Sequence, residues 1–440
     1  MYLRGSKWSM SKRRKPLNLF RIMFLAVVVG AAIYVNQFIV PTIQPIGVPT
    51  LTPTRDPESY LTDAESLYQQ GKFGPAIAAF AQVVQARPKD AATYIEMARA
   101  QVWYGKYEDA QKSAEYALLL NPNNSMAYAV RGWALDFQGK YLDSETSIKR
   151  ALAIDGNNAL AHAYYAELLA DIIAANPGGR GDAVTLAGVE SKTALGLDAG
   201  LFEAHRARGY VYYVTSTDNL DLAVGEYQAA IAINKNIEDV YIKLGLAYQA
   251  MALNNEAIDA FGTAISDNPT DPLPSFYTSR IYATLGQFDT AIQYAQTAVG
   301  VAPADTRLHG NLGVMFYRKN RYPEAIQELS YVIKGGTLAD GTVVKPLDIT
   351  DSSRTPEYFS VYGLALAKLK PPRCGEAVLV AQQIRARLPG DETSVFNADE
   401  INRLCSLSAD ATAGTPVISV TNTPAAPVGA GGSATITPTP

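Results

Sequence analysis

A repeat of fixed spacing constrains the fold of this 440-residue chain more than any other feature of its sequence. The first copy is marked by Tyr60, Gly71, Phe73, Ala76 and Pro88. The second copy carries, 34 residues later, Tyr94, Gly105, Tyr107, Ala110 and Pro122, and the third carries Tyr128, Gly139, Tyr141, Ser144 and Gly156. A period of this length predicts stacked units, because one unit alone cannot bury its apolar face.

Each repeat has the pattern of two helices joined by a tight turn. Apolar residues recur at helical spacing on both sides of a Gly-Lys-Tyr or Gly-Lys-Phe turn. Glycine adopts the backbone conformation of such a turn without the steric penalty of a side chain. The small side chains of Ala76 and Ala110 allow two antiparallel helices to approach closely, and Asn121-Pro122 ends the second helix.

This pattern resembles the tetratricopeptide repeat family, in which each unit is a helix-turn-helix. The resemblance implies an all-α, right-handed superhelical solenoid of about nine helical hairpins, which we place at residues 58–408. The spacing slips by nine residues in the turn of the fourth unit and by two in that of the fifth. It then returns at Gly245, Ser279 and Gly313.

The repeat pattern breaks between about residues 335 and 355, where Asp340-Gly341 predicts the turn of a short β-hairpin. A ninth, degenerate unit follows this insertion. Residues 397–404 then predict a short capping helix, which would cover the apolar face that the last unit leaves exposed.

The N-terminal charges predict a membrane anchor. Seven basic residues lie within residues 4–21, the first acidic residue is Asp56, and residues 22–54 carry no charge. The apolar run at residues 22–40 is long enough to cross a bilayer as one helix, and the basic residues before it predict a cytoplasmic tail at residues 1–21. The alternative is a cleaved signal peptide, which would also export the repeats. We therefore expect a single-pass protein of the cell membrane with its repeats on the extracytoplasmic side.

The segments that flank the repeats differ from them in composition. Residues 41–57 hold five prolines, which predicts a semi-rigid stalk. Residues 409–440 consist mainly of Ala, Thr, Pro, Gly and Val and are predicted to be disordered. Cys374 and Cys405 are predicted to form a disulfide in an exported domain, because the packing order of a superhelix brings their segments together. Two buried free thiols are the alternative.

The sequence carries no pattern that predicts catalysis. His162, His205 and His309 occupy equivalent places near the start of the first helix in different units, so they cannot converge on one centre. No phosphate-binding glycine loop, metal-ligand spacing or nucleophile constellation is present in the sequence. We therefore expect no enzymatic activity, no cofactor, no metal site and no nucleic-acid partner.

The family resemblance also implies a concave groove, lined by the first helices of the hairpins, that holds extended peptides or partner helices. The residues at groove-facing places are Arg99, Trp103, Trp133, Phe137, Arg206, Tyr210, Tyr213, Arg280, Tyr317 and Arg318. Aromatic and arginine side chains are enriched at binding hot spots. The alternative for each residue is packing within or between repeats.

The expected function is that of a non-catalytic protein-protein interaction scaffold of the cell envelope, which binds a protein or peptide partner in this groove. Two alternatives stay open. Rows of Trp and Tyr also suit a glycan or peptidoglycan strand, and the hairpin at Asp340-Gly341 also suits the docking element of an accessory subunit in an envelope enzyme complex. Stacked arrays dimerise through terminal units as well, so a homodimer is a further open alternative.

Overall fold

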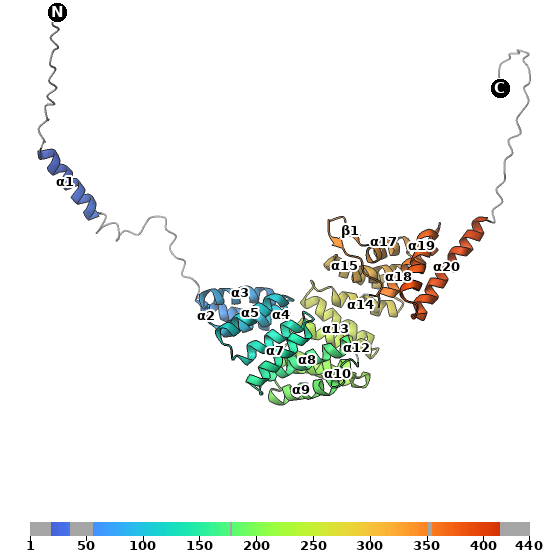
Figure 1. Ribbon diagram of the computed structural model, residues 1–440, viewed down its shortest axis with the longest axis horizontal. Helices are drawn as coiled ribbons and strands as arrows, with labels where there is room; N and C mark the ends of the chain where they lie inside the picture. Colours follow the sequence, from blue (N-terminus) through green and yellow to red (C-terminus); the bar gives the residue numbers. More distant parts are fainter. Residues whose placement is uncertain (1–18, 36–55, 177, 351–353, 414–440) are drawn as a thin grey trace, which may run out of the picture. The chain divides into compact units, whose positions relative to one another are not determined.

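The computed structural model describes residues 19–35, 56–176, 178–350 and 354–413 of the chain (Figure 1). The chain divides into two compact units, Met1–Ser59 and Tyr60–Pro440. The first unit contains the helix α1 (Leu19–Tyr34). The second contains the repeats.

Helix α1 overlaps the predicted transmembrane segment at residues 22–40 only in part. It is 16 residues long, and residues 36–40 lie outside the described part of the chain. Across the described ranges, none of the helices combines the length and the apolar composition that a bilayer span requires. The predicted cytoplasmic tail and stalk also lie almost entirely outside the described residues.

The second unit is an all-α repeat solenoid, and its described residues form the nine expected hairpins. The first helices of the hairpins are α2 (Pro57–Gln69), α4 (Ala91–Trp103), α6 (Ser125–Asp136), α8 (Ala159–Ala175), α10 (Phe202–Thr215), α12 (Glu238–Ala250), α14 (Leu273–Thr284), α16 (Thr306–Arg318) and α18 (Thr355–Lys368). The second helices are α3 (Phe73–Ala86), α5 (Tyr107–Leu120), α7 (Tyr141–Ile154), α9 (Ala183–Leu197), α11 (Leu220–Ile233), α13 (Asn254–Asp267), α15 (Phe288–Val301), α17 (Tyr322–Lys334) and α19 (Cys374–Arg387). The 3₁₀ turn η3 (Thr217–Asn219) precedes α11.

The local sequence explains where these helices begin and how tightly they pair. The side chains of Asp90, Asn124 and Asn158 accept hydrogen bonds from backbone N–H groups in the first turns of α4, α6 and α8. Such caps satisfy donors that a helix start leaves unpaired. Ala110 and Ala151 are fully buried where α5 and α7 approach their neighbours. Small side chains at these places bring the helices of a hairpin close together.

The insertion after α17 forms the predicted hairpin. Its strands β1 (Gly336–Thr337) and β2 (Val343–Val344) pair antiparallel, and the turn between them contains Asp340-Gly341. The capping helix α20 (Glu392–Ala413) is longer than the expected residues 397–404 and extends into the tail predicted to be disordered from residue 409. The rest of that tail, residues 414–440, lies outside the described part.

Helix α20 covers the last hairpin and is bonded to it. Ala398 and Ile401 of α20 are fully buried in one apolar cluster with α18 and α19. Cys374 at the start of α19 and Cys405 of α20 form a disulfide, the pairing that the sequence predicted.

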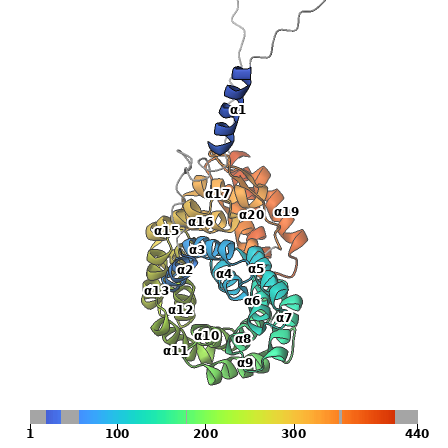
Figure 2. The same ribbon diagram turned by 90° about the vertical axis from the view of Figure 1, so that its left-hand side faces the viewer.

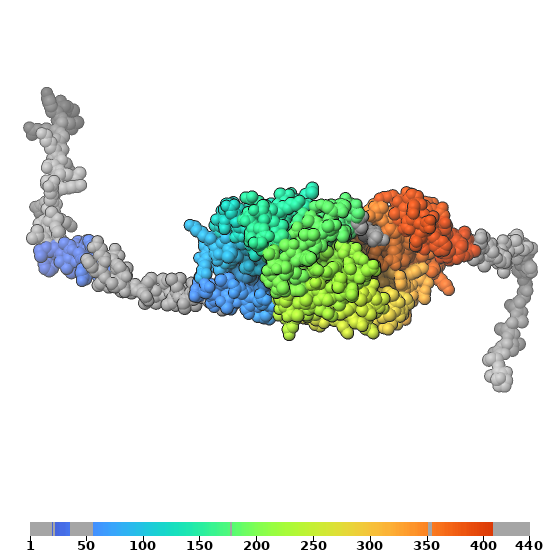
Figure 3. Space-filling view, turned by 90° about the horizontal axis from the view of Figure 1, so that it is seen from below, coloured from blue at the N-terminus to red at the C-terminus, as the bar shows by residue number. Residues whose placement is uncertain are grey.

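The chain of hairpins turns back on itself, so that the first hairpin contacts the loop between the fifth and sixth. Asn236 Nδ2 donates a hydrogen bond to the backbone carbonyl of Gln69 at 3.0 Å, and Asn234 Nδ2 lies 3.5 Å from Gln69 Oε1. Figure 2 shows the helices α2–α13 as a closed ring, with α2 and α3 next to α13. Figure 3 shows the blue surface of the first hairpin meeting the yellow-green surface that follows α11.

Candidate functional site

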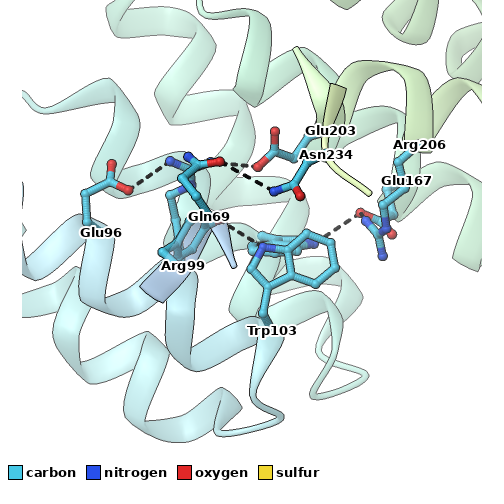
Figure 4. A network of polar contacts seen from close by, with 10 residues as sticks. Gln69, Glu96, Arg99, Trp103, Glu167, Glu203, Arg206 and Asn234 are labelled. Carbon is cyan, nitrogen blue, oxygen red and sulfur yellow. Dashed lines mark hydrogen bonds and ion pairs between the residues drawn. The ribbon is translucent and has the colours of Figure 1, made fainter. Parts of the chain in front are cut away.

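The first helices of the first six hairpins face the inside of this ring, and several of their side chains are buried there. Arg206 of α10 is only 1% exposed. Its Nη1 donates to Glu167 Oε2 of α8 at 2.7 Å, and its Nε donates to Asp239 Oδ2 of α12 at 2.5 Å. One arginine therefore joins three successive inner helices, as Figure 4 shows in part.

A second ion pair crosses the ring between hairpins that are distant in sequence. Arg99 Nη2 of α4 donates to Glu203 Oε1 of α10 at 2.6 Å, and Arg99 Nη1 donates to Glu96 at 2.9 Å (Figure 4). Because Glu203 is buried, removing Arg99 would leave a buried charge unpaired, which typically destabilises a protein by about 3–5 kcal/mol. These contacts hold the ring closed from inside.

Aromatic rings pack between the two ion pairs. The Trp103 indole lies 4.8 Å from the guanidinium carbon of Arg206, and its Nε1 donates to the Tyr68 hydroxyl at 3.0 Å. Trp133 is fully buried, stacks on Tyr164 with ring centroids 4.4 Å apart, and donates its Nε1 to Glu167 at 3.1 Å. These rings are therefore engaged by groups of the chain itself.

A cluster of acidic side chains lies beside this interior network. Asp136 is 3% exposed, and neither of its carboxylate oxygens accepts a hydrogen bond. Burial, together with the charges of Asp171 and Glu167, raises the pKa of Asp136 well above its usual value. Asp171 accepts a hydrogen bond from the Tyr210 hydroxyl at 2.7 Å, and the Lys243 ammonium lies 4.1 Å from the Tyr210 ring centroid.

The closure of the ring creates a cleft of about 920 Å³, which we call the closure cleft. One part of its lining comes from the turns of the first three hairpins and is aromatic, with Phe73, Trp103, Tyr104, Tyr107 and Phe137. The other part comes from α12, the end of α13 and the loop after it, and is acidic, with Glu238, Asp239, Asp267 and Asp271.

The negative charges in the acidic part of the closure cleft are only partly balanced by nearby cations. Although burial opposes it, the Arg206 guanidinium holds the pKa of Asp239 below its usual value. Burial and the neighbouring Asp271 raise the pKa of Glu238 to about 8, and Glu238 Oε1 has no hydrogen-bond partner. Burial also raises the pKa of the Tyr107 hydroxyl, and Asp239 adds to this shift.

The C-terminal hairpins present a different surface on their inner helices. Arg280 of α14 lies with its guanidinium carbon 5.7 Å from the Phe276 ring centroid, and it forms no ion pair within the described ranges. Burial and the nearby Arg354 lower the pKa of Arg280. Arg307 of α16 is 63% exposed at its side chain. We call Phe276, Tyr277, Arg280, Arg307 and Arg354 the basic-aromatic face.

The predicted groove residues fall into two groups. The first group lies in or beside the closed ring and consists of Arg99, Trp103, Trp133, Phe137, Arg206, Tyr210 and Tyr213. Within it, Trp133 is fully buried and offers no surface to a ligand, while Phe137, Trp103 and the largely buried Arg206 line the closure cleft.

The second group consists of Arg280, Tyr317 and Arg318, which lie on α14 and α16. Tyr317 accepts a hydrogen bond from Lys368 Nζ at 2.8 Å, and Arg318 lies 3.6 Å from Glu357. None of these contacts tests whether the ten residues bind a partner, so that role stays a prediction.

The three histidines make one repeated structural contact. His309 Nδ1 bonds to Glu328 of the following helix at 2.6 Å, and its Nε2 bonds to the carbonyl of Pro303, six residues earlier, at 2.9 Å. His162 and His205 make the same pair of contacts in their own hairpins. Within the residues that the structure describes, no three His, Cys, Asp or Glu side chains are grouped as metal ligands.

Sequence reasoning missed the acidic partners in and beside the ring. Glu167 and Asp171 are the two acidic residues of α8, a helix that is otherwise rich in Ala and Leu. They are four residues apart and so share one face of the helix. That spacing was an available signal for a buried polar site. Glu238 and Asp271 gave no such signal, because their role depends on ring closure.

Comparison with known proteins agrees with the repeat assignment. Two family descriptions, both named tetratricopeptide repeat, match residues 67–134 and residues 242–300 and 278–337. The chain is 24% identical to Cell division cycle protein 27 homolog A of Arabidopsis thaliana over 94 residues. This match covers 21% of this chain and 13% of that protein. The chain is also 32% identical to Small glutamine-rich tetratricopeptide repeat-containing protein 2 of Mycosarcoma maydis over 71 residues. This second match covers 16% of this chain and 20% of that protein.

This chain therefore spans about a fifth or less of the length of these curated relatives. Among solved structures, that of a human IFIT1 dimer with PPP-AAAA is similar with a TM-score of 0.51 at 16% identity. The match covers 80% of this chain and 83% of that chain. At this identity the similarity shows the fold alone.

Proposed function

The chain contains tetratricopeptide repeats, which generally serve as protein-interaction scaffolds, and from this premise we propose that it is a non-catalytic scaffold that binds another protein. The partner would lie as an extended segment or a helix along the basic-aromatic face. The main support for this proposal is that the Arg280 guanidinium is partly buried and forms no ion pair in the described part of the chain. An acidic side chain on a partner would relieve that state.

The arrangement of the basic-aromatic face supports a protein ligand. Tyr277 and Tyr358 lie within electrostatic reach of Arg280 and Arg307, so the cations are distributed around aromatic rings. Arginine and tyrosine are among the residue types most enriched at protein-binding hot spots. The glycan alternative relied on Trp103, Trp133 and Tyr210, whose side chains are already engaged within the chain.

Photocrosslinking from a defined position tests the scaffold proposal. A benzophenone side chain at Phe276 on the inner helix α14 should crosslink a specific protein in cells that express the chain. The same group at Leu379, which is 64% exposed on α19, is the matched control on another surface. Crosslinking of the same proteins from both positions would contradict the proposal.

The crosslinked partner then allows a quantitative test with purified proteins. The double variant Arg280→Ala, Arg307→Ala should weaken binding at least tenfold, because two arginine contacts are lost. Arg150→Ala on α7 is the control for loss of charge alone and should leave the affinity unchanged. An affinity that is equal in all three proteins would sink this placement of the site.

We also propose that residues 22–40 anchor the protein in the cell membrane with the repeats on the extracytoplasmic side. The support is the asymmetry of the sequence, in which seven basic residues precede an uncharged run at residues 22–54. Alkaline extraction of membranes should leave the full chain in the pellet and release a chain that lacks residues 1–40. Added protease should digest the repeats in spheroplasts or intact cells. Full extraction of both chains would refute the anchor.

A further inference from the structure

The closure cleft has an aromatic lining and an acidic lining, and both can attract a cation. Its aromatic part includes Tyr104, which is 54% exposed, and Phe137, which is 37% exposed. Its acidic part contains Glu238 and Asp271, neither of which forms an ion pair within the described residues. Aromatic faces attract cations, and the attraction grows when the cation is removed from water. Carboxylates next to aromatic rings therefore favour a cationic guest.

The cations that line the closure cleft do not neutralise this surface. Arg206 already bonds to Glu167 and Asp239. Lys72 is exposed, and its Nζ donates to Gln70 at 2.9 Å. The high pKa of Glu238 is a consequence of burial and of crowding with Asp271, and a positive charge placed between the two carboxylates would relieve the crowding.

A second, independent observation points to a peptide. Arg206 lines the closure cleft and is 1% exposed, yet its Nη2 has no hydrogen-bond acceptor. A buried donor without an acceptor is unfavourable, so an acceptor supplied by a ligand would be favourable there. A backbone carbonyl is such an acceptor. A peptide carries carbonyl groups together with cationic side chains, whereas a free polyamine carries only the cations.

We propose that the closure cleft binds an arginine or lysine side chain of another protein, with the cation between the aromatic and acidic linings and a backbone carbonyl of the same segment on Arg206 Nη2. This site goes beyond the scaffold function proposed above, since it is separate from the basic-aromatic face and selects the opposite charge. The volume of about 920 Å³ accommodates a segment of a few residues.

The probe for this proposal is the peptide Gly-Arg-Gly-Arg-Gly-amide with fluorescein on its N-terminal amine, titrated with the purified full chain in fluorescence anisotropy. The matched peptide with glutamine in place of arginine should bind at least tenfold more weakly. Unlabelled arginine peptide should displace the probe at lower concentration than spermidine does, because spermidine has no acceptor for Arg206.

Variants of the protein then locate the binding site. The isosteric double variant Glu238→Gln, Asp271→Asn should weaken peptide binding at least tenfold, and Tyr104→Leu should weaken it severalfold, while Tyr104→Phe should retain it. Glu256→Gln, which removes an exposed carboxylate of α13 outside the cleft, should leave the affinity unchanged. Thermal melts should show that each variant is folded.

Three results would overturn the proposal. In the first, the arginine peptide does not bind the wild-type chain. In the second, it binds the double variant as tightly as the wild type. In the third, spermidine displaces the probe as well as the unlabelled arginine peptide does. Failure here leaves the crosslinking test at Phe276 unaffected, because that test reports on a different surface.

Discussion

At the scale of single residues, several ionisable side chains of this protein form hydrogen bonds that stabilise the fold. His309 lies between the Glu328 carboxylate and the Pro303 carbonyl, so both of its ring nitrogens are engaged. Although burial opposes it, the hydrogen bond to Glu328 raises the pKa of His309 above its ordinary value. The protonated imidazolium can donate from both nitrogens, which fits the two acceptors around it.

The raised pKa of His309 predicts the sign of a pH effect. Stability from this contact is fully present below the unfolded pKa of about 6.5 and is lost as the pH rises through the higher folded pKa. His309→Gln should therefore lower the melting temperature more at pH 6 than at pH 9, with a difference in free energy of about 1–2 kcal/mol. Calorimetry at the two pH values measures this, and an equal loss at both would contradict it.

Asp136 differs from His309, because both of its carboxylate oxygens are buried and neither accepts a hydrogen bond. Because its pKa is raised on folding, protonation of Asp136 favours the folded state; this stabilisation is fully present below the unfolded pKa of about 3.9 and is lost as the pH rises through the higher folded pKa. Asp136→Asn should therefore stabilise the chain at pH 7–8 by about 1–3 kcal/mol. Asp143→Asn on the exposed face of α7 is the matched control. A variant less stable than the wild type at pH 8 would show that Asp136 is paired in solution.

At the scale of elements, local patterns specified the hairpins, while contacts between elements set their ends. The Gly-Lys-aromatic turns are encoded within a few residues, so the sequence was sufficient to place them, and the caps Asp90 and Asn124 found in the structure are equally local. The capping helix was predicted at residues 397–404, but α20 begins at Glu392. At its start, Asp391 Oδ1 accepts a hydrogen bond from the backbone N–H of Ser394, and beyond residue 404 Cys405 packs in the apolar cluster with α18 and α19.

The disulfide predicts how this last element responds to reduction. The chain-entropy model gives about 3–4 kcal/mol for closing a loop of this length. Reduction should therefore speed hydrogen exchange in α19 and α20 more than in α16, because Cys374 and Cys405 join only the terminal elements. The double variant Cys374→Ser, Cys405→Ser should show the faster exchange without reductant and no further change with it. An effect of reductant on that variant would point to a cause other than the disulfide.

At the scale of the whole repeat unit, ring closure is the feature that sequence reasoning did not find. The helices α3 to α11 lie between Gln69 and Asn236, so their contact depends on the small rotations that each hairpin adds to the next. The longer turn of the fourth hairpin contributes to that sum, and its conformation cannot be derived from the period. For the same reason the burial of Arg206 and Trp133 inside the ring was not foreseen.

A matched pair of glycine variants tests whether closure is a property of the protein in solution. Gly71 and Gly139 have nearly the same positive φ, +71° and +70°, so alanine introduces similar backbone strain of about 1–2 kcal/mol at each. A Cβ atom at Gly71 would lie 2.0 Å from the Asn236 carbonyl oxygen, whereas one at Gly139 would meet nothing within 4 Å. Gly71→Ala should therefore raise hydrogen exchange in the loop before α12 and increase the radius of gyration, while Gly139→Ala should change neither. Equal behaviour of the two variants would mean that the ring is open in solution, and that the closure cleft is then absent as well.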